Sequence, residues 1–241
     1  MSETPLGWAQ LFDNGRGDAD NEVPFLGIAQ ALAADAHCIL EVGCGRGGAV
    51  DVDQPKAFQD LRGPGRVVVG IDLDPAAADN PVLDEFRLIE SSGRWPLEDG
   101  EADLAVSDWV LEHVGDPQQF VAELTRVLRP GGVFVARTVS RRSPLSVAAR
   151  LIPNHRHSRV LSKLQPTREE RDVFPTQYRM NSRPDLDALL TDYEWNIVHC
   201  SGLHHYLKPW PRFSRAVAAT EPRIPRSWRM TIILYARKRS I

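Results

Sequence analysis

The amino-acid sequence predicts an α/β protein built on a doubly wound, mostly parallel β-sheet. Between residues 38 and 137, short runs rich in β-branched residues alternate with longer amphipathic runs. Each short run is nearly all apolar and is bounded by Gly, Pro or acidic residues, which is typical of strands buried on both faces. Strands that alternate with helices in this way form a parallel sheet with right-handed crossovers.

The expected elements follow in chain order. Strands are expected at residues 38–42, 67–72, 86–90, 103–107 and 133–138, and later at 195–200 and 230–236. Helices are expected at residues 25–35, about 56–61, 109–114, 118–128 and 183–193. The Arg-Pro-Gly-Gly segment at 129–132 is expected to end a helix and to turn into the next strand.

Two segments interrupt the alternation of strands and helices. Residues 141–182 are rich in Arg, Pro and His, and residues 202–228 are polar and aromatic. No linker separates either segment from the strands beside it. We therefore expect one domain over residues 1–241, in which both segments are lid insertions that cover one edge of the sheet.

Composition narrows the class of protein. The 241 residues carry a net charge of -3, which gives no electrostatic reason to expect nucleic acid or an anionic membrane as a partner. The first thirty residues hold no apolar run of signal-peptide length, and no run is long enough to span a bilayer. The three cysteines are scattered, which favours a reducing compartment over disulfides. We expect a cytoplasmic protein without a membrane or nucleic-acid partner.

A glycine-rich turn follows the first expected strand. Gly43, Gly45 and Gly48 fit the G-x-G-x-x-G spacing of dinucleotide-binding proteins. However, Glu41 lies at the strand end, and residues 49–55 add two carboxylates and a proline where a pyrophosphate would need a helix N-terminus. Carboxylates repel phosphate and attract an ammonium or sulfonium group. The turn is therefore expected to hold a cationic ligand.

Four segments in order resemble the motifs of a known family. They are residues 41–47 (EVGCGRG), 69–75 (VGIDLDP), 95–114 around the fourth strand, and 126–132 (RVLRPGG). Together they resemble the class I S-adenosylmethionine-dependent methyltransferases of the type-11 family, over about residues 39–138. The resemblance implies a three-layer Rossmann-like sandwich, a mostly parallel seven-stranded sheet with an antiparallel last strand, and a cofactor-binding core at about 36–140. It also implies S-adenosyl-L-methionine as cofactor and S-adenosyl-L-homocysteine as product.

The resemblance assigns contacts around the glycine turn. Glu41 would hold the methionine amine of the cofactor through water. Gly43 and Gly45, with Cys44 between them, would supply the backbone of the turn. Asp72 would accept hydrogen bonds from the ribose hydroxyls, although a plain acidic residue at a strand end is the alternative interpretation.

Further cofactor contacts are assigned to the ends of other strands. Leu73 would lie against the adenine, and Ser91 and Ser92 fall where family members contact the adenine amine. Many members carry an acidic residue there, so Ser91 departs from the family pattern. Ser107 and Asp108 would line the methionine end.

A hydroxyl acceptor needs a base to take its proton, and histidine is the first candidate. His113 follows the fourth strand, near the expected methyl group, and is our candidate for the base. In the resembling family this histidine occurs with different chemistries, so the alternative is that it organises the site.

Four residues are expected to bind the acceptor: Arg137, Tyr178, Arg179 and His204. Arg137 ends the fifth strand and could instead cap a helix or pair with an acid. Tyr178 and Arg179 lie in a distinctive aromatic and basic segment at 172–181. The alternative for Phe174 and Tyr178 is that they anchor the lid to the sheet.

Several patterns give only weak support to other functions or ligand sites. The D-x-D patterns at 51/53 and 72/74 are found in metal-dependent glycosyltransferases, but such triplets are common by chance. The histidine pairs at 155/157 and 204/205 lack a carboxylate or cysteine at ligand spacing, so no metal is expected. Trp210 and Phe213, among basic residues, could form another acceptor wall or stack RNA bases.

The expected function is methyl transfer to a small-molecule acceptor at oxygen, without a metal, by a monomer or homodimer. Oxygen is favoured because histidines are available, and because residues 107–110 (SDWV) do not resemble the Asn/Asp-Pro-Pro-Tyr motif of N-methyltransferases. Methylation at nitrogen or carbon remains open. The rival functions are a nicotinamide-dependent oxidoreductase and a non-catalytic cofactor-binding protein.

Overall fold

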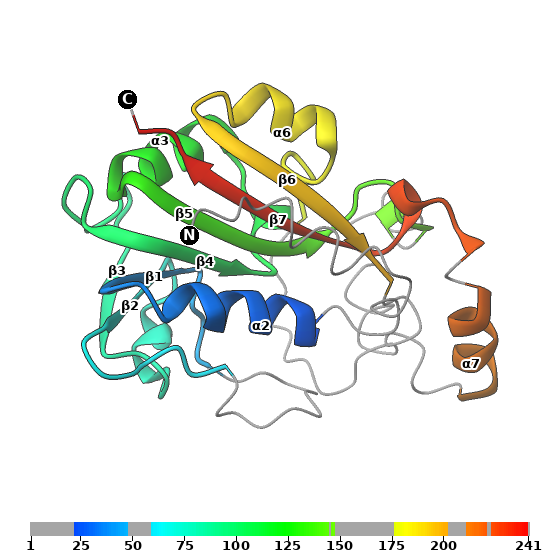
Figure 1. The fold of residues 1–241 in the computed structure, drawn as a ribbon, viewed down its shortest axis with the longest axis horizontal. Helices are drawn as coiled ribbons and strands as arrows, with labels where there is room; N and C mark the ends of the chain where they lie inside the picture. Colours follow the sequence, from blue (N-terminus) through cyan, green and yellow to red (C-terminus); the bar gives the residue numbers. More distant parts are fainter. Residues whose placement is uncertain are drawn as a thin grey trace.

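The structure is a computed structural model, and it describes residues 22–47, 59–144, 146–147, 176–201, 211–220 and 223–240. Seven strands form one sheet in the order β3-β2-β1-β4-β5-β7-β6 (Figure 1). The strands are β1 (Cys38–Val42), β2 (Val67–Asp72), β3 (Glu85–Leu88), β4 (Ala102–Asp108), β5 (Leu128–Val139), β6 (Tyr193–Cys200) and β7 (Thr231–Lys238).

The strand directions confirm the mostly parallel sheet. β1 pairs in parallel with β2 and β4, and the pairs β2–β3 and β4–β5 are also parallel. Only β7 is antiparallel, to β5 on one side and to β6 on the other. β6 therefore runs in the same direction as β5. The carboxyl ends of β1 to β6 and the amino end of β7 share one edge, which we call the carboxyl edge.

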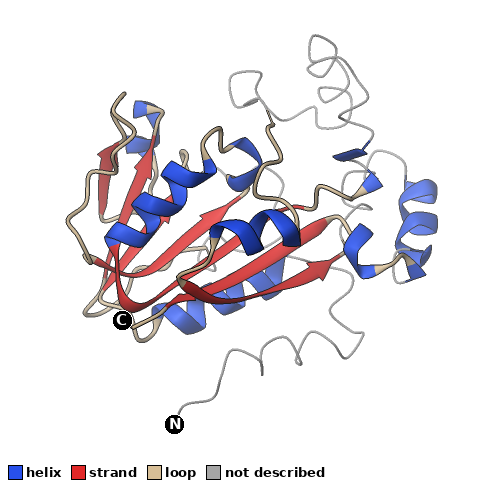
Figure 2. Cartoon of the chain, turned by 90° about the horizontal axis from the view of Figure 1, so that it is seen from above, coloured by secondary structure: helices blue, strands red, loops and turns tan. Residues whose placement is uncertain are grey.

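Helices cover both faces of the sheet (Figure 2). One face packs on α2, through Phe25 and other apolar residues, and the other face packs on α3 and α6. The helices and 3-10 turns are α2 (Glu22–Ala33), η2 (Pro75–Asp79), η3 (Leu111–His113), α3 (Pro117–Val127), α6 (Arg183–Leu189), α7 (Pro211–Thr220) and η7 (Arg226–Trp228).

The two faces follow the two-residue period of each strand. In β1, Ile39 belongs to the core under α2 and Leu40 to the core under α3 and α6. In β4 and β5, Val106 and Val135 belong to the core under α2. Alternation therefore places Glu41, Asp108 and Arg137, each two residues further along, on the α2 face at the carboxyl edge.

The expected strands agree with the structure most closely where they are buried on both faces. The first two strands begin and end as expected. The turn expected at 129–132 instead belongs to β5, which already pairs through Leu128 with Ala102. The register shifts between Ala102 and Leu104, so residues 129–132 form an irregularity inside the ladder, with Gly131 at φ 76°.

Two expected helices differ from the structure. The helix expected at 109–114 is wrong, because Trp109 has φ 57° and only the 3-10 turn η3 follows it. The helix expected at 183–193 ends at Leu189, because β6 begins at Tyr193 and pairs with β7. Of the helix expected at about 56–61, residues 59–61 are not helical and the rest lies outside the described residues.

Most of the first expected lid insertion, and residues 202–210 and 221–222 of the second, lie outside the described residues, and the single-domain organisation stays a prediction. Among the helices that the structure describes, none has the length and apolar character needed to cross a membrane.

Candidate functional site

The turn after β1 brings the backbone close to β2 and to the end of β4. The backbone N–H groups of Gly43 and Cys44 both donate to the carbonyl of Ile71, at 2.8 and 3.2 Å. Gly43 has φ 69°, and a Cβ atom there would lie 2.4 Å from Cγ2 of Val110. Gly43 is therefore required both for its left-handed backbone and for this close approach.

The side chain of Asn80 holds the glycine turn through hydrogen bonds. This residue was not identified from the sequence. Its buried amide Nδ2 donates to the carbonyls of Cys44 and Gly45, at 2.9 and 3.3 Å. A Cβ atom on Gly47, which has φ 65°, would lie 2.3 Å from Oδ1 of Asn80. No spacing in the glycine motif points to a residue that follows it by more than thirty positions.

Asp72 ties the turn after β1 to the turn after β2. Its Oδ2 accepts from the backbone N–H of Gly45 at 2.9 Å, and its Oδ1 accepts from Asp74 N–H, also at 2.9 Å. Each carboxylate oxygen has a second lone pair, which leaves Asp72 able to accept from hydroxyls as well. The following residue, Leu73, has an exposed fraction of 69%, so an apolar surface lies beside this carboxylate.

Glu41 lies near three other carboxylates at this end of the sheet. Burial and, to a smaller extent, the negative charges of Asp108, Asp60 and Asp72 together raise the pKa of Glu41 to about 8. A carboxyl group held in this state gains stability when a cation arrives beside it. The residues present therefore fit the positively charged amine and sulfonium of S-adenosyl-L-methionine.

Asp108 is held by Arg137. Two parallel hydrogen bonds join them, from Nε to Oδ1 at 2.6 Å and from Nη2 to Oδ2 at 2.7 Å. The guanidinium is also held between two aromatic rings, 5.1 Å from the centroid of Phe25 and 5.0 Å from that of Trp109. Arg137 is buried, so the structure places it with Asp108 and these rings; its role in acceptor binding stays a prediction.

Ser107 lies at the same strand end as Asp108. Its side chain is fully buried, and its Oγ has no hydrogen-bond partner in the described part of the chain. Buried hydroxyls normally have a partner. An unsatisfied hydroxyl here is consistent with the ligand contact that the family resemblance assigns to Ser107.

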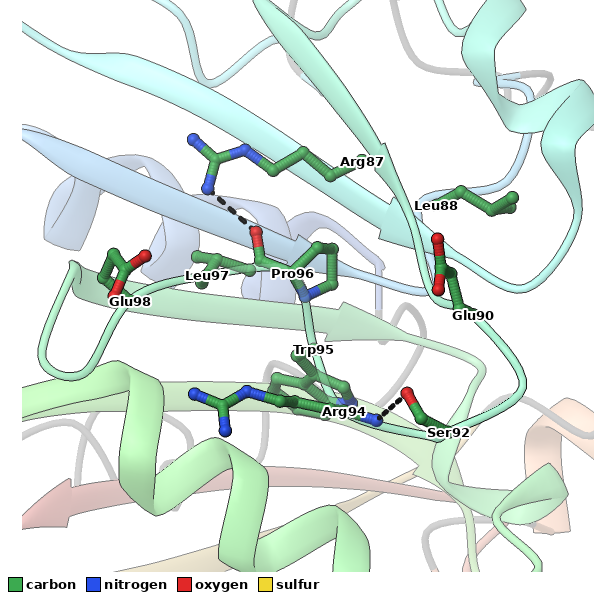
Figure 3. Close-up of a pocket in the computed structure, with 9 residues that line it drawn as sticks. All are labelled: Arg87, Leu88, Glu90, Ser92, Arg94, Trp95, Pro96, Leu97 and Glu98. Atoms are coloured by element: carbon green, nitrogen blue, oxygen red, sulfur yellow. Dashed lines mark hydrogen bonds between the residues drawn. The ribbon is translucent and has the colours of Figure 1, made fainter.

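Ser91 and Ser92 are both exposed, on the loop after β3. This loop lies beside Asp72, because Ile89 N–H donates to the Asp72 carbonyl at 2.8 Å. Ser92 also lines a polar pocket between β3 and the segment leading to β4 (Figure 3), where Arg87 donates to the carbonyl of Pro96 at 3.0 Å. The pocket includes neither Glu41 nor Asp72, so it is not part of the site at the glycine turn.

His113 ends η3 and is half-buried. The preceding residue, Glu112, is buried, and its Oε2 accepts from the hydroxyl of Thr138 at 2.8 Å. The amide Nδ2 of Asn181 donates to the same hydroxyl at 2.7 Å. Sequence reasoning missed Glu112 and Asn181, because only the pairing of distant segments brings them together.

The segment with Tyr178 and Arg179 is bound to the turn that carries His113. The backbone N–H groups of Gln177 and Tyr178 donate to the carbonyl of Glu112, at 2.6 and 3.2 Å. The Arg179 guanidinium donates to the carbonyl of Gly115 at 2.7 Å. These residues therefore lie near the carboxyl end of β4, and their contact with an acceptor stays a prediction. His204, Phe174 and Trp210 lie outside the described residues.

The described residues contain no group of three or more His, Cys, Asp or Glu side chains that could hold a metal ion. Histidines 155, 157, 204 and 205 fall outside those residues. Independence from metal stays a prediction.

Comparison with known proteins identifies the central part of the chain. Residues 40–136 match the protein family described as a methyltransferase domain. A Mycolicibacterium smegmatis protein named as an S-adenosylmethionine-dependent methyltransferase is 37% identical over 124 residues, which make up 50% of this chain and 44% of that relative. The chain thus spans less than half the length of this relative.

Solved structures show the same fold. A Haloferax volcanii methyltransferase, solved in complex with the Trm112 activator, has a TM-score of 0.55 at 18% identity, over 97% of this chain and 95% of its own. Geranyl diphosphate C-methyltransferase from Streptomyces coelicolor has a TM-score of 0.52 at 18% identity, over 97% of this chain and 76% of its own.

The family match covers β1 to β5, and these strands carry the glycine turn, Asp72 and Asp108. The sheet order and the acidic carboxyl edge agree with that match. The match over residues 40–136 and the geometry of the glycine turn support a methyltransferase domain in this part of the chain, with S-adenosyl-L-methionine as its cofactor.

Proposed function

We propose that this protein transfers a methyl group to an oxygen atom of a small-molecule acceptor, without a metal ion. The observation that supports the methyl donor most is the set of carboxylates at the carboxyl edge, where burial and the negative charges of Asp108, Asp60 and Asp72 raise the pKa of Glu41. Such a site attracts a cationic methyl donor and repels the pyrophosphate of a nicotinamide dinucleotide.

The residues of the glycine turn and strand ends would each bind one part of the cofactor. Glu41 would pair with the methionine amine, and Asp72 would accept from the ribose hydroxyls. The methionine end would contact the unsatisfied hydroxyl of Ser107 and the carboxylate of Asp108. The exposed side chain of Leu73 would pack on the adenine.

The bound cofactor supplies an electrophilic methyl group on a positively charged sulfur. The protein then has to align the acceptor oxygen with the carbon–sulfur bond and to exclude water, so proximity provides much of the rate. His113 is our candidate for the base that takes the hydroxyl proton. It lies on the turn that the Tyr178 segment contacts through Glu112, which would put base and acceptor on the same side.

A thermal-melting experiment tests the cofactor assignment. The full chain is melted alone, with S-adenosyl-L-homocysteine, and with NADH. A ligand at about 100 times its Kd stabilises by roughly 2.7 kcal/mol, and we expect this shift with S-adenosyl-L-homocysteine and none with NADH. A shift with NADH alone would overturn the proposal.

A second experiment tests the reaction and the atom that is methylated. Cell-extract metabolites are incubated with the protein and methyl-labelled cofactor, with and without EDTA, and labelled products are identified by mass spectrometry and NMR. We expect an O-methylated product that forms equally with EDTA. Because the Streptomyces coelicolor neighbour is named as a C-methyltransferase, a C- or N-methylated product is the outcome that would correct the acceptor atom.

The role of His113 needs a matched pair of variants. We expect His113→Ala to keep its affinity for S-adenosyl-L-homocysteine and to lose at least about 100-fold in kcat, the range of general-base catalysis. His113→Asn keeps a polar side chain without a base at neutral pH. If it restores turnover, the histidine organises the site and is not the base. Cofactor binding without turnover of any acceptor would favour a non-catalytic role.

A further inference from the structure

The other half of the carboxyl edge, formed by β5, β6 and β7, carries a histidine and several arginines in place of carboxylates. In β6, His199 pairs with Ile232 of β7, which itself pairs with Thr138 of β5. Ile197 belongs to the core under α3 and α6, so alternation places His199 on that same face. His199 therefore lies in the same row of the sheet as Thr138, whose hydroxyl contacts Glu112 beside His113.

Three arginines from three different segments lie around His199. The Arg229 guanidinium donates to the His199 carbonyl at 3.4 Å. Arg183, the first residue of α6, lies 5.0 Å from the ring centroid of Trp195, which shares a face with His199. Arg142 follows the end of β5. We call Arg142, Arg183 and Arg229 the arginine cluster.

The arginine cluster also affects the ionisation of His199. Burial lowers the pKa of His199 to about 4, and the positive charges of Arg183, Arg229 and Arg142 contribute to the lowering. His199 is therefore neutral at physiological pH. Its buried Nδ1 has no hydrogen-bond partner in the part of the chain that the structure describes.

The nearby carboxylates are already engaged. Asp185 of α6 accepts from Ser182 and pairs with Arg141 at 3.6 Å. Glu112 accepts from Thr138. Arg142 and Arg183 make no ion pair with any residue that the structure describes, and both are exposed. Arg142 and Arg183 thus present cationic groups that these carboxylates do not neutralise.

We propose that the arginine cluster binds a carboxylate or phosphate group of the methyl acceptor, so that the substrate is an anionic small molecule. Arginine presents planar donors that match both of these anions. The neutral imidazole of His199 adds one donor, from the nitrogen that lacks a partner. This inference rests on the proposed function, because it assigns the acceptor of the same reaction.

The site can be tested without knowing the acceptor. The full chain is labelled on its histidines and saturated with S-adenosyl-L-homocysteine, and inorganic phosphate is titrated at fixed pH while the imidazole resonances are followed by NMR. The His199 resonance is assigned with His199→Asn. We expect a saturable shift of this resonance, and no shift with sodium chloride at equal ionic strength.

Matched variants connect the binding to the cluster. In the double variant Arg142→Gln/Arg183→Gln, the Kd for phosphate is expected to rise at least 10-fold. Arg237→Gln is the control, because Arg237 is also exposed but lies on β7 near the opposite edge of the sheet. Circular dichroism checks that both variants fold, and the single variant Arg142→Gln serves if the double variant does not.

The outcomes separate this inference from the proposed function. A non-saturable shift, an equal shift with chloride, or an equal rise in Kd in Arg237→Gln would overturn the anion site. If phosphate binds as expected but S-adenosyl-L-homocysteine gives no thermal shift, the anion site stands and the proposed reaction fails. If the thermal shift is present and phosphate does not bind, the cofactor assignment stands and the anion site is overturned.

Discussion

The two halves of the carboxyl edge carry opposite charges. At the ends of β1, β2 and β4, Glu41, Asp72 and Asp108 form an acidic half that fits the cationic cofactor. At the ends of β5 and β6 and the start of β7, Arg142, Arg229 and the neighbouring Arg183 form a basic half. One sheet therefore presents two distinct electrostatic environments along a single edge.

Under the proposed assignment, this difference separates the methyl donor from the methyl acceptor along one edge of the sheet. Parallel pairing brings every strand end to the same edge, and the residues at those ends set the local charge. Arg137 lies where the halves meet, since it is near the carboxyl end of β5 and pairs with Asp108 of β4.

The largest expected effect comes from breaking this junction. Arg137→Met would leave Asp108 without its partner and would remove the guanidinium from between Phe25 and Trp109, so we expect the free energy of unfolding to fall by about 3 kcal/mol. Urea denaturation measures it. The control is Arg129→Met, which removes the partner of Asp103 from an exposed pair and should cost less than about 1 kcal/mol. Equal losses of unfolding free energy in the two variants would show that the Asp108–Arg137 pair stabilises the fold no more than an exposed ion pair does.

The next effect tests the acidic half. Asp72→Ala removes the acceptor for Gly45 and Asp74 and the proposed ribose contact, so the Kd for S-adenosyl-L-homocysteine should rise about 100-fold. Calorimetric titration measures it. Asp84→Ala is the control, because its carboxylate accepts from Val68 N–H at the opposite end of β2, at 2.9 Å. A comparable loss of affinity in this control would contradict a direct role for Asp72.

The third prediction concerns pH. Because the pKa of Glu41 is about 8 in the cofactor-free protein and 4.5 ordinarily, the folded state holds an extra proton between these values. The stability of the free protein should therefore fall as pH rises through this window. Binding of an ammonium group favours the ionised carboxyl, so the affinity for S-adenosyl-L-homocysteine should rise with pH, by up to about tenfold per unit.

Calorimetry in two buffers of different ionisation enthalpy measures the proton released on binding. Glu41→Gln should bind weakly and without proton release between pH 5 and 8. If the wild-type protein releases no proton on binding in this pH window, Glu41 does not contact the cofactor amine.

The smallest expected effect concerns apolar contact in the acidic half. Leu73→Ala should weaken binding of S-adenosyl-L-homocysteine about fivefold, since about 1 kcal/mol of apolar burial on the adenine is lost. Val67→Ala, at the other end of β2, also truncates an exposed apolar side chain and should leave the Kd unchanged. If Leu73→Ala also leaves the Kd unchanged, the adenine lies elsewhere.

The sequence predicted the elements whose signal is local. β1 and β2 were located to the residue, because a strand buried on both faces gives a continuous apolar run between polar ends. The helix at Trp109 was wrong for a non-local reason. Trp109 covers Arg137, and its left-handed backbone follows from packing that involves β5.

The candidate site divides in the same way. Motif spacing located Glu41, Gly43 and Asp72, which the structure brings together through the turns after β1 and β2. Asn80 and the arginine cluster gave no sequence signal, because each depends on segments far apart in the chain. The charge of the basic half becomes visible only when β5, β7 and β6 are paired.

The position of β7 between β5 and β6 has a consequence for assembly. β6 joins the sheet only through β7, although it precedes β7 in the chain. During synthesis, β5 would remain an open edge and β6 would stay unpaired until residues 231–238 emerge from the ribosome. The nascent chain would therefore form its glycine turn early, whereas the basic half of the carboxyl edge would be complete only after β7 is inserted.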